Sequence, residues 1–336
     1  MHRLLWPVWN AAERRPRAPV RLALFAVALL ASSAGIGIGV GLLASTLLAP
    51  LRASLPPALV GAPLVGNAVG TAAGTVLVVA LVALAGVALD RRRLRDYGLG
   101  IDRDWWLDLG FGLLLGALLL TLVFAVEYAA GWVAVRETFR TAGPLPFPTA
   151  FLAAVVLFLG VGVTEELLLR GYVLTNLAEG VGVLGGRAAV GLATLGSSAL
   201  FGVLHAANPN ATPVSTVAVG LAGVMLALGY VLTGDLAIPI GLHVTWNLFQ
   251  GPVYGYPVSG TDLGVSALVL ARSGPRAATG GPFGPEAGLT GIGAMVLGTV
   301  AIVGYVRWRY GRVDLAPLSV PALRWWRWAE PVDGED

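Results

Sequence analysis

The chain has 336 residues, of which 56% are hydrophobic and only 12% are charged, and its mean hydropathy is +0.78. Soluble domains carry about twice that share of charged residues, so this composition excludes a soluble globular fold. The absence of cysteine excludes a disulfide framework and a thiol nucleophile. The net charge of +3 comes without a basic groove interleaved with aromatic residues, so no nucleic acid is expected as a partner.

Apolar runs long enough to cross a bilayer predict an all-α fold, a polytopic transmembrane helical bundle of about eight spans. An arginine-rich stretch precedes the first span, whose 29 residues and lack of a cleavage site indicate an uncleaved anchor. The predicted spans are residues 20–48, 58–89, 105–135, 148–174, 188–207, 213–233, 236–254 and 287–306.

The placement of arginine predicts how the bundle is oriented. All 22 basic residues are arginine, and eight spans starting from a cytoplasmic N-terminus put 17 of them inside and five outside. Short cytoplasmic loops are enriched in basic residues, so this distribution favours an even number of spans. The expected location is the plasma membrane, with several crossings and both termini cytoplasmic.

Three parts of the chain are expected. Residues 1–104 would hold a cytoplasmic segment, two transmembrane helices and a basic loop, and residues 105–254 a membrane core. Residues 255–336 would hold an external loop, the last span and a cytoplasmic tail. The loop, up to residue 286, is rich in Gly and Pro and is typical of a structured or partly inserted connection.

Unusual polar residues gather in three apolar segments of the core. Charged side chains at membrane depth mark functional sites by default. Residues four apart share a helix face, so each segment would offer a short polar patch to a common interior. The patches are Glu165, Glu166 and Arg170; Phe201 and His205; and His243 and Asn247.

These residue types form a usable hydrolytic set. A carboxylate in an apolar pocket is suited to take a proton from water. The imidazoles of His205 and His243 could orient that water, stabilise an oxyanion or bind a metal, and the Asn247 amide could donate to a developing oxyanion. Arg170 would pair with Glu166 and hold the helix in register, leaving Glu165 as the freer carboxylate.

The motifs resemble those of the CPBP intramembrane proteases, which include the C-a-a-X prenyl endopeptidases and bacterial members linked to bacteriocin processing or self-immunity. The matching residues are E-E-x-x-x-R at 165–170, F-x-x-x-H at 201–205 and H-x-x-x-N at 243–247, all within 148–250. The resemblance implies an intramembrane endopeptidase acting on a peptide or membrane-protein substrate in the lipid bilayer. It implies that Glu165, next to Glu166, activates water and that Asn247 lines the oxyanion site.

In the same resemblance His205 and His243 assist Glu165 or, with it, bind a divalent metal such as zinc, so the cofactor stays open. Whether the substrate is prenylated also stays open. A proton-coupled membrane transporter and a non-catalytic binding or immunity protein are the alternatives, although a carrier would predict an inverted repeat.

Three structural questions remain at this stage. The glutamates and Arg170 could form only a buried ion pair, and Glu127 could serve either helix packing or a substrate cavity. If residues 188–207 and 236–254 were simple crossings, His205 and His243 would lie at opposite ends of the bundle. Either the span 213–233 is short or tilted, or the helices near Pro209, Pro213 and Pro239 are broken around a water-filled cavity.

Overall fold

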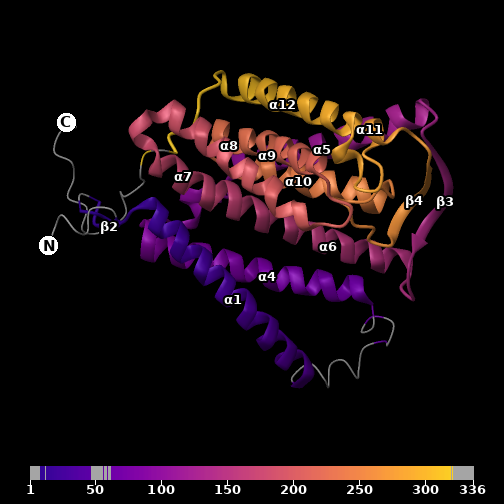
Figure 1. Cartoon of the computed structure of the whole chain (residues 1–336), viewed down its shortest axis with the longest axis horizontal. Coiled ribbons are helices and arrows are strands. Elements are labelled where there is room, and N and C mark those ends of the chain that lie inside the picture. Colours follow the sequence, from indigo (N-terminus) through magenta and orange to yellow (C-terminus); the bar gives the residue numbers. More distant parts are fainter. Residues whose placement is uncertain are drawn as a thin grey trace.

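The structure, a computed structural model, describes residues 8–11, 13–46, 56, 59, 62–318 and 320, and within the first helix it describes side chains only as far as Ser32. It is mostly helical. Long helices lie side by side along the longest axis, with a β-ribbon at one end (Figure 1). Most of the expected cytoplasmic tail, residues 321–336, lies outside the described residues.

Six helical stretches are long and apolar enough to cross a membrane in the described part of the chain, so the protein is a multi-pass membrane protein by helix composition. They are α4 (Pro63–Ala85) with η1 (Gly86–Asp90), α5 (Arg103–Ala129), α6 (Phe147–Glu166) continuing through η3 (Leu167–Leu174) into α7 (Thr175–Gly180), α8 (Gly186–Leu204) with η5 (His205–Ala207), α9 (Pro213–Thr233) and α12 (Leu289–Tyr310).

The expected count of eight is not confirmed. The first predicted span, 20–48, coincides with α1 (Ala18–Thr46), but only Ala18–Ser32 of this helix is described in full, which is too short to count as a crossing. The predicted span 236–254 is instead α10 (Ala237–Leu248), a helix of 12 residues followed by a π-helical turn, η6 (Phe249–Val253).

Helix α10 begins inside the bundle and is buried along its whole length apart from Leu248. The N–H of Leu236, just before it, donates to the carbonyl of Gly98 at 2.9 Å. Its side chains join two apolar cores, Ile240 and Val244 in one and Ile238 and Leu242 in the other. A short helix that starts at depth carries His243 to the level of His205, which removes the conflict that two full crossings would create.

Glycines let α5 and α10 approach at backbone distance. A Cβ built on Gly112 would lie 2.4 Å from the carbonyl oxygen of Ile238, and one on Gly116 would lie 2.5 Å from that of Leu242. A Cβ on Gly241 would lie 2.5 Å from the carbonyl oxygen of Leu109. Small residues at such crossings are what permit close helix packing in membranes.

An antiparallel ribbon of two strands corrects the expectation of an all-α fold. Strand β3 (Val133–Thr141) pairs with β4 (Val265–Arg272), from Val133 opposite Arg272 to Thr141 opposite Val265. The third predicted span, 105–135, therefore ends earlier, at Ala129, and part of the predicted external loop is a strand. A second, minimal pair joins β1 (Trp9–Asn10) to β2 (Arg15–Pro16).

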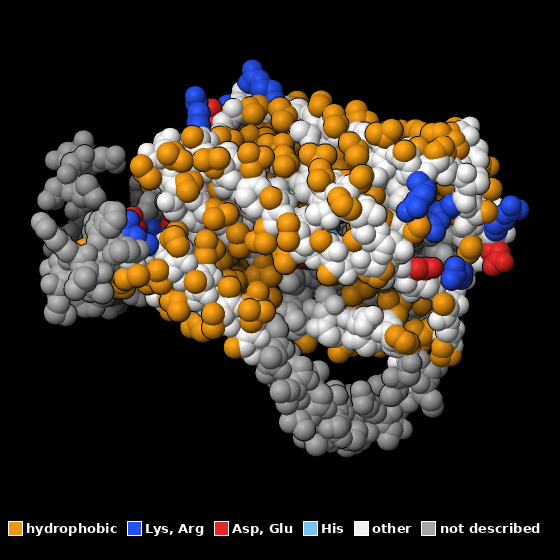
Figure 2. Space-filling view, viewed as in Figure 1, with side chains coloured by type: hydrophobic (Ala, Val, Ile, Leu, Met, Phe, Trp, Pro, Cys, Tyr) orange, Lys and Arg blue, Asp and Glu red, His pale blue; other side chains and the backbone are white. Residues whose placement is uncertain are grey.

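The end opposite the β3–β4 ribbon is held by buried ion pairs. Arg15, Arg21 and Arg92 all bind the carboxylate of Glu179, and Arg21 also pairs with Asp90 at 3.0 Å. Figure 2 shows hydrophobic side chains over the flank of the bundle and charged side chains gathered toward its ends. This distribution fits a body whose flank contacts lipid.

Candidate active site

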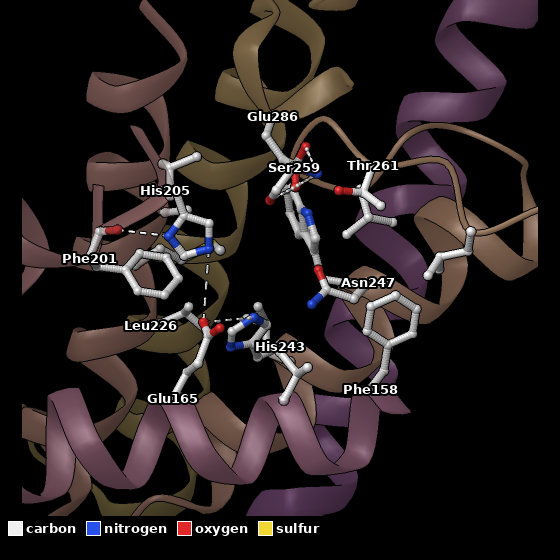
Figure 3. A pocket seen from close by; sticks show the side chains of 18 residues that line it. Phe158, Glu165, Phe201, His205, Leu226, His243, Asn247, Ser259, Thr261 and Glu286 are labelled. Atoms are coloured by element: carbon white, nitrogen blue, oxygen red, sulfur yellow. Dashed lines mark hydrogen bonds and ion pairs between the residues drawn. The ribbon is translucent and has the colours of Figure 1, made fainter. Parts of the chain in front are cut away.

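A cavity of about 190 Å³ lies among α6, α8, α9 and α10, and the segment 258–263 that leads into β4 forms one wall. The polar side chains facing it come from separate elements and point toward a common centre (Figure 3). Those predicted from the sequence are Glu165, His205, His243 and Asn247, together with the ring of Phe201. The remaining wall is largely apolar.

The two adjacent glutamates differ in their surroundings. The side chain of Glu165 is 31% exposed and faces the cavity, whereas that of Glu166 is 0% exposed and does not line it. Glu166 binds Arg170 at 2.9 Å and the Nδ1 of His243 at 2.7 Å, both through Oε1. Glu166, expected among the catalytic residues, thus lies behind the cavity, and Glu165 is the carboxylate within it.

Both histidines have one ring nitrogen occupied. The carbonyl of Phe201 lies 2.8 Å from Nδ1 of His205, and the carboxylate of Glu166 holds Nδ1 of His243. A carbonyl or a carboxylate accepts a hydrogen bond, so each Nδ1 carries the proton, and in a neutral ring Nε2 presents a lone pair. Each Nε2 faces the carboxylate of Glu165.

Three acceptors therefore converge on one point. Oε2 of Glu165 lies 4.0 Å from Nε2 of His205 and 3.9 Å from Nε2 of His243, and this oxygen is buried without a hydrogen-bond partner. Separations of this size between polar groups are those that a bridging water spans. A water at this point could donate one hydrogen to Glu165 and the other to one of the two imidazoles.

The same three groups were the predicted metal ligands. Ligands of a tetrahedral zinc ion lie about 3.3 Å apart, which is closer than these atoms stand. In the described residues no group of three His, Asp or Glu side chains is gathered tightly enough to hold a metal. The donor types suit a metal, but the spacing suits a water.

Arg170 has the predicted partner and two others. Besides Glu166, it donates to the carbonyl of Gly223 on α9 at 3.2 Å, and its guanidinium lies 4.4 Å from the centre of the Phe201 ring on α8. The residue sits in η3, a π-helical stretch of the kind often found at functional sites. Arg170 thus joins three elements behind the cavity.

Sequence reasoning missed three polar residues of the cavity wall: Ser259, Thr261 and Glu286. Glu286 accepts hydrogen bonds from Gln250 at 2.7 Å and from the hydroxyl of Ser259 at 2.9 Å. It precedes the last span, and burial raises its pKa to about 7. The only sequence signal was an acidic residue within a Gly/Pro-rich stretch that has no periodicity.

Glu127 does not line the cavity. It accepts hydrogen bonds from the hydroxyls of Tyr256 at 3.0 Å and Thr290 at 2.8 Å, so it joins α5 to the segments before β4 and at the start of α12. Of the two alternatives for this residue, the structure supports packing.

Residues 147–249 match the family model described as type II CAAX prenyl endopeptidase Rce1-like. This segment is an Rce1-like CAAX endopeptidase domain. The family is one of hydrolases, and membership implies an intramembrane protease rather than a carrier. The Rce1-like domain contains Glu165, His205, His243 and Asn247, whereas Ser259 and Glu286 lie beyond it. No curated protein and no solved structure matches the chain.

Proposed function

We propose that this chain is an intramembrane endopeptidase that hydrolyses a peptide bond with a water activated by Glu165. The observation that carries the proposal is the partnerless oxygen of Glu165, which lies within 4.0 Å of two imidazole nitrogens in one cavity. A water that donates to Glu165 and to one of the imidazoles has both hydrogens directed toward these acceptors and its oxygen lone pairs free. That is the orientation a nucleophile needs.

The reaction would proceed in two steps. Glu165 takes a proton from the water while the water oxygen bonds to the carbonyl carbon of the substrate. The carbonyl oxygen, on which negative charge develops, accepts a hydrogen bond from the amide of Asn247, which faces the cavity. The proton then passes from Glu165 to the departing nitrogen as the carbon–nitrogen bond breaks.

Glu166 and Phe201 would keep the histidines in the required tautomer. Because their oxygens engage Nδ1 of His243 and of His205, both Nε2 atoms stay directed at the water. A divalent metal, if one binds, would be held by Glu165, His205 and His243 after these side chains close by several tenths of an ångström, and it would supply Lewis acidity.

The substrate class follows from the family and the cavity wall. The family description names prenylated C-a-a-X proteins, and the largely apolar wall is compatible with either a prenylated or a plain hydrophobic segment. We propose a peptide or membrane-protein substrate and leave the choice to a direct comparison of peptides.

The test uses the purified protein in proteoliposomes with two fluorogenic peptides of one sequence, one farnesylated and one not. Glu165→Gln keeps the shape but removes the base, so the rate should fall by roughly 10²- to 10⁴-fold while the melting temperature stays unchanged. Glu137→Gln, on the exposed face of β3, is the matched control and should retain full activity.

Two outcomes would overturn this assignment. Full activity of Glu165→Gln would remove the proposed base, and a covalent peptide adduct on Ser259 would replace the water by a serine nucleophile. Ser197 is a poorer candidate because it is buried and donates its hydroxyl to the carbonyl of Leu169 at 2.7 Å. A chelator separates the metal route: loss of activity that zinc restores would show that a metal takes part, whereas the spacing of the ligands predicts no response.

A further inference from the structure

The 256–261 wall, the segment that includes the cavity-lining residues Val258, Ser259 and Thr261, is held by one buried carboxylate. Glu286 is 4% exposed and receives the N–H of Ser259 at 3.2 Å, the hydroxyl of Ser259 at 2.9 Å and the side-chain amide of Gln250 at 2.7 Å. Gln250 also donates to the carbonyl of Pro257 at 2.6 Å. All these contacts lie outside the 147–249 domain, at the end of the cavity nearest the β3–β4 ribbon.

The same wall is tied to the segment that follows His205. The side chain of Asn208 donates to the carbonyl of Ser259 at 3.1 Å, and that of Asn210 donates to the carbonyl of Gly260 at 3.3 Å. Gly260 has a φ of +88°, and a Cβ there would fall 1.8 Å from the carbonyl oxygen of Pro209. Only glycine permits this approach, so the two segments form one unit.

A continuous chain of hydrogen bonds therefore leads from Glu286 through Ser259 to Asn208, three residues beyond His205. His205 itself lies at the C-terminal end of α8, where the helix tightens into η5. A helix end has unpaired carbonyls and is held by its surroundings more than by its own ladder. The position of the His205 ring thus depends on what Asn208 binds.

We propose that Glu286 is a positioning residue of the proposed active site, which fixes the 256–261 wall and, through Ser259 and Asn208, the imidazole of His205. This inference rests on the proposed hydrolytic function. It means that a residue beyond the Rce1-like domain helps to position a side chain of the proposed active site. It also explains a buried acidic residue that no ion pair in the described part of the chain accounts for.

The ionised carboxylate of Glu286 accepts on both oxygens. The backbone N–H of Ser259 and the side-chain NH₂ of Gln250 can only donate, so a glutamine at 286 would place its NH₂ group against one of these donors. A donor facing a donor in a buried site loses one hydrogen bond and leaves both groups unsatisfied. Glu286→Gln should therefore release the wall while preserving side-chain volume.

Glu127 provides the matched control. It is also a buried carboxylate that receives two hydroxyl groups, one from Tyr256 and one from Thr290 at the start of α12. Neither of these residues lines the cavity, and neither belongs to the hydrogen-bond chain that joins Glu286, Ser259 and Asn208. Glu127→Gln should lower the melting temperature without changing kcat.

The experiment measures kcat and KM for Glu286→Gln, Asn208→Ala and the double variant with the better of the two fluorogenic peptides. Each single change should lower kcat by about ten- to a hundredfold, because displacements of about 1 Å at a reacting group have effects of that size. The double variant should lose no more than the worse single variant, since both break one chain. Modification of His205 by diethyl pyrocarbonate, followed by mass spectrometry, should change in Glu286→Gln and not in Glu127→Gln.

Full kcat in Glu286→Gln, or losses that multiply in the double variant, would overturn the inference. If Glu286→Gln fails to fold, Asn208→Ala provides the test, because the hydrogen bond from Asn208 to Ser259 is only partly buried. A normal kcat in Asn208→Ala would then overturn the proposed connection from Glu286 to His205. An inactive Glu165→Gln beside a fully active Glu286→Gln would leave the proposed function standing and remove only this inference. Lack of cleavage by the unmodified protein would overturn the proposed function itself.

Discussion

At the scale of single residues, Glu166 serves two partners from different helices. Its carboxylate binds Arg170 on its own helix and His243 on α10, 77 positions away. Arg170 in turn reaches α8 through the ring of Phe201, which also lines the cavity. Glu166 and Arg170 thus form a charged layer that contacts the cavity-lining side chains of His243 and Phe201 from behind. A substitution in this layer should therefore displace those side chains.

Arg170→Ala tests this layer. Removing one partner of a buried pair costs on the order of 3–5 kcal/mol, so the melting temperature should fall and the activity with it. Arg187→Ala, an exposed arginine at the start of α8, should change neither. Thermal unfolding and peptide cleavage measured on both variants decide the matter, and a stable, fully active Arg170→Ala protein would show that the pair is dispensable.

Much of the candidate site could be predicted at this scale because helical spacing is local. Four-residue spacing paired Glu166 with Arg170 and set Phe201 against His205, and the structure has both contacts. The contact of Glu166 with His243 could not be predicted, because it depends on how α6 packs on α10. Glu286 was missed for the same reason, since it reaches the cavity through a loop.

At the scale of elements, α5 and α10 pack closely along a seam of glycines. Gly112 and Gly116 of α5 face the backbone of α10, and Gly241 of α10 faces the backbone of α5. His243 lies two residues after Gly241, so we expect this seam to set its depth and rotation. A side chain added on the seam would force α5 and α10 apart.

Gly116→Val should therefore displace His243. The new Cβ would lie 2.3 Å from the hydroxyl of Thr245 and 2.5 Å from the carbonyl of Leu242, and overpacking of this kind costs about 1–3 kcal/mol or more. We expect a lower melting temperature and a loss of activity of at least about tenfold. Gly110→Val on the same helix has nothing within 4 Å and should behave as the unmodified protein. Equal activity of the two variants would mean that the seam does not position His243.

The errors of prediction at this scale have physical causes. An apolar helix buried in protein and one facing lipid have the same hydropathy, so α10 was assigned as a full span. Strand β3 follows α5 after a short turn, and its first three residues, Val133–Val135, extended the apolar run. Its partner β4 comes more than a hundred residues later, and such a pairing leaves no local signal.

At the scale of the whole molecule, the charge distribution supports one orientation in the membrane. The ion pairs of Arg15, Arg21 and Arg92 lie at one end, and Arg307 and Arg309 close α12 at the same end. The β3–β4 ribbon lies at the other (Figure 1). From the positive-inside rule we predict that the arginine-rich end faces the cytoplasm. The 258–263 wall of the cavity would then lie toward the outside.

Because the chain has no cysteine, single cysteines can report this orientation without background. Thr138→Cys on β3 should react with a membrane-impermeant maleimide on intact cells, and Arg312→Cys, which is 79% exposed after α12, should react only after permeabilisation. Labelling is read by mass shift. The reverse pattern would place the arginine-rich end outside.

The shortness of α10 also bears on how the protein is made. The twelve residues of α10 and the five of η6 together span about 25 Å, less than the roughly 30 Å of a hydrocarbon core, so we expect this segment to be inserted less readily on its own than a full span. We expect it to settle among its neighbours after they have been inserted. His243 would then reach Glu165 only late in biogenesis, and Glu286 leaves the ribosome later still. A nascent or truncated chain would carry the hydrolytic groups apart, and so stay inert until the bundle is complete.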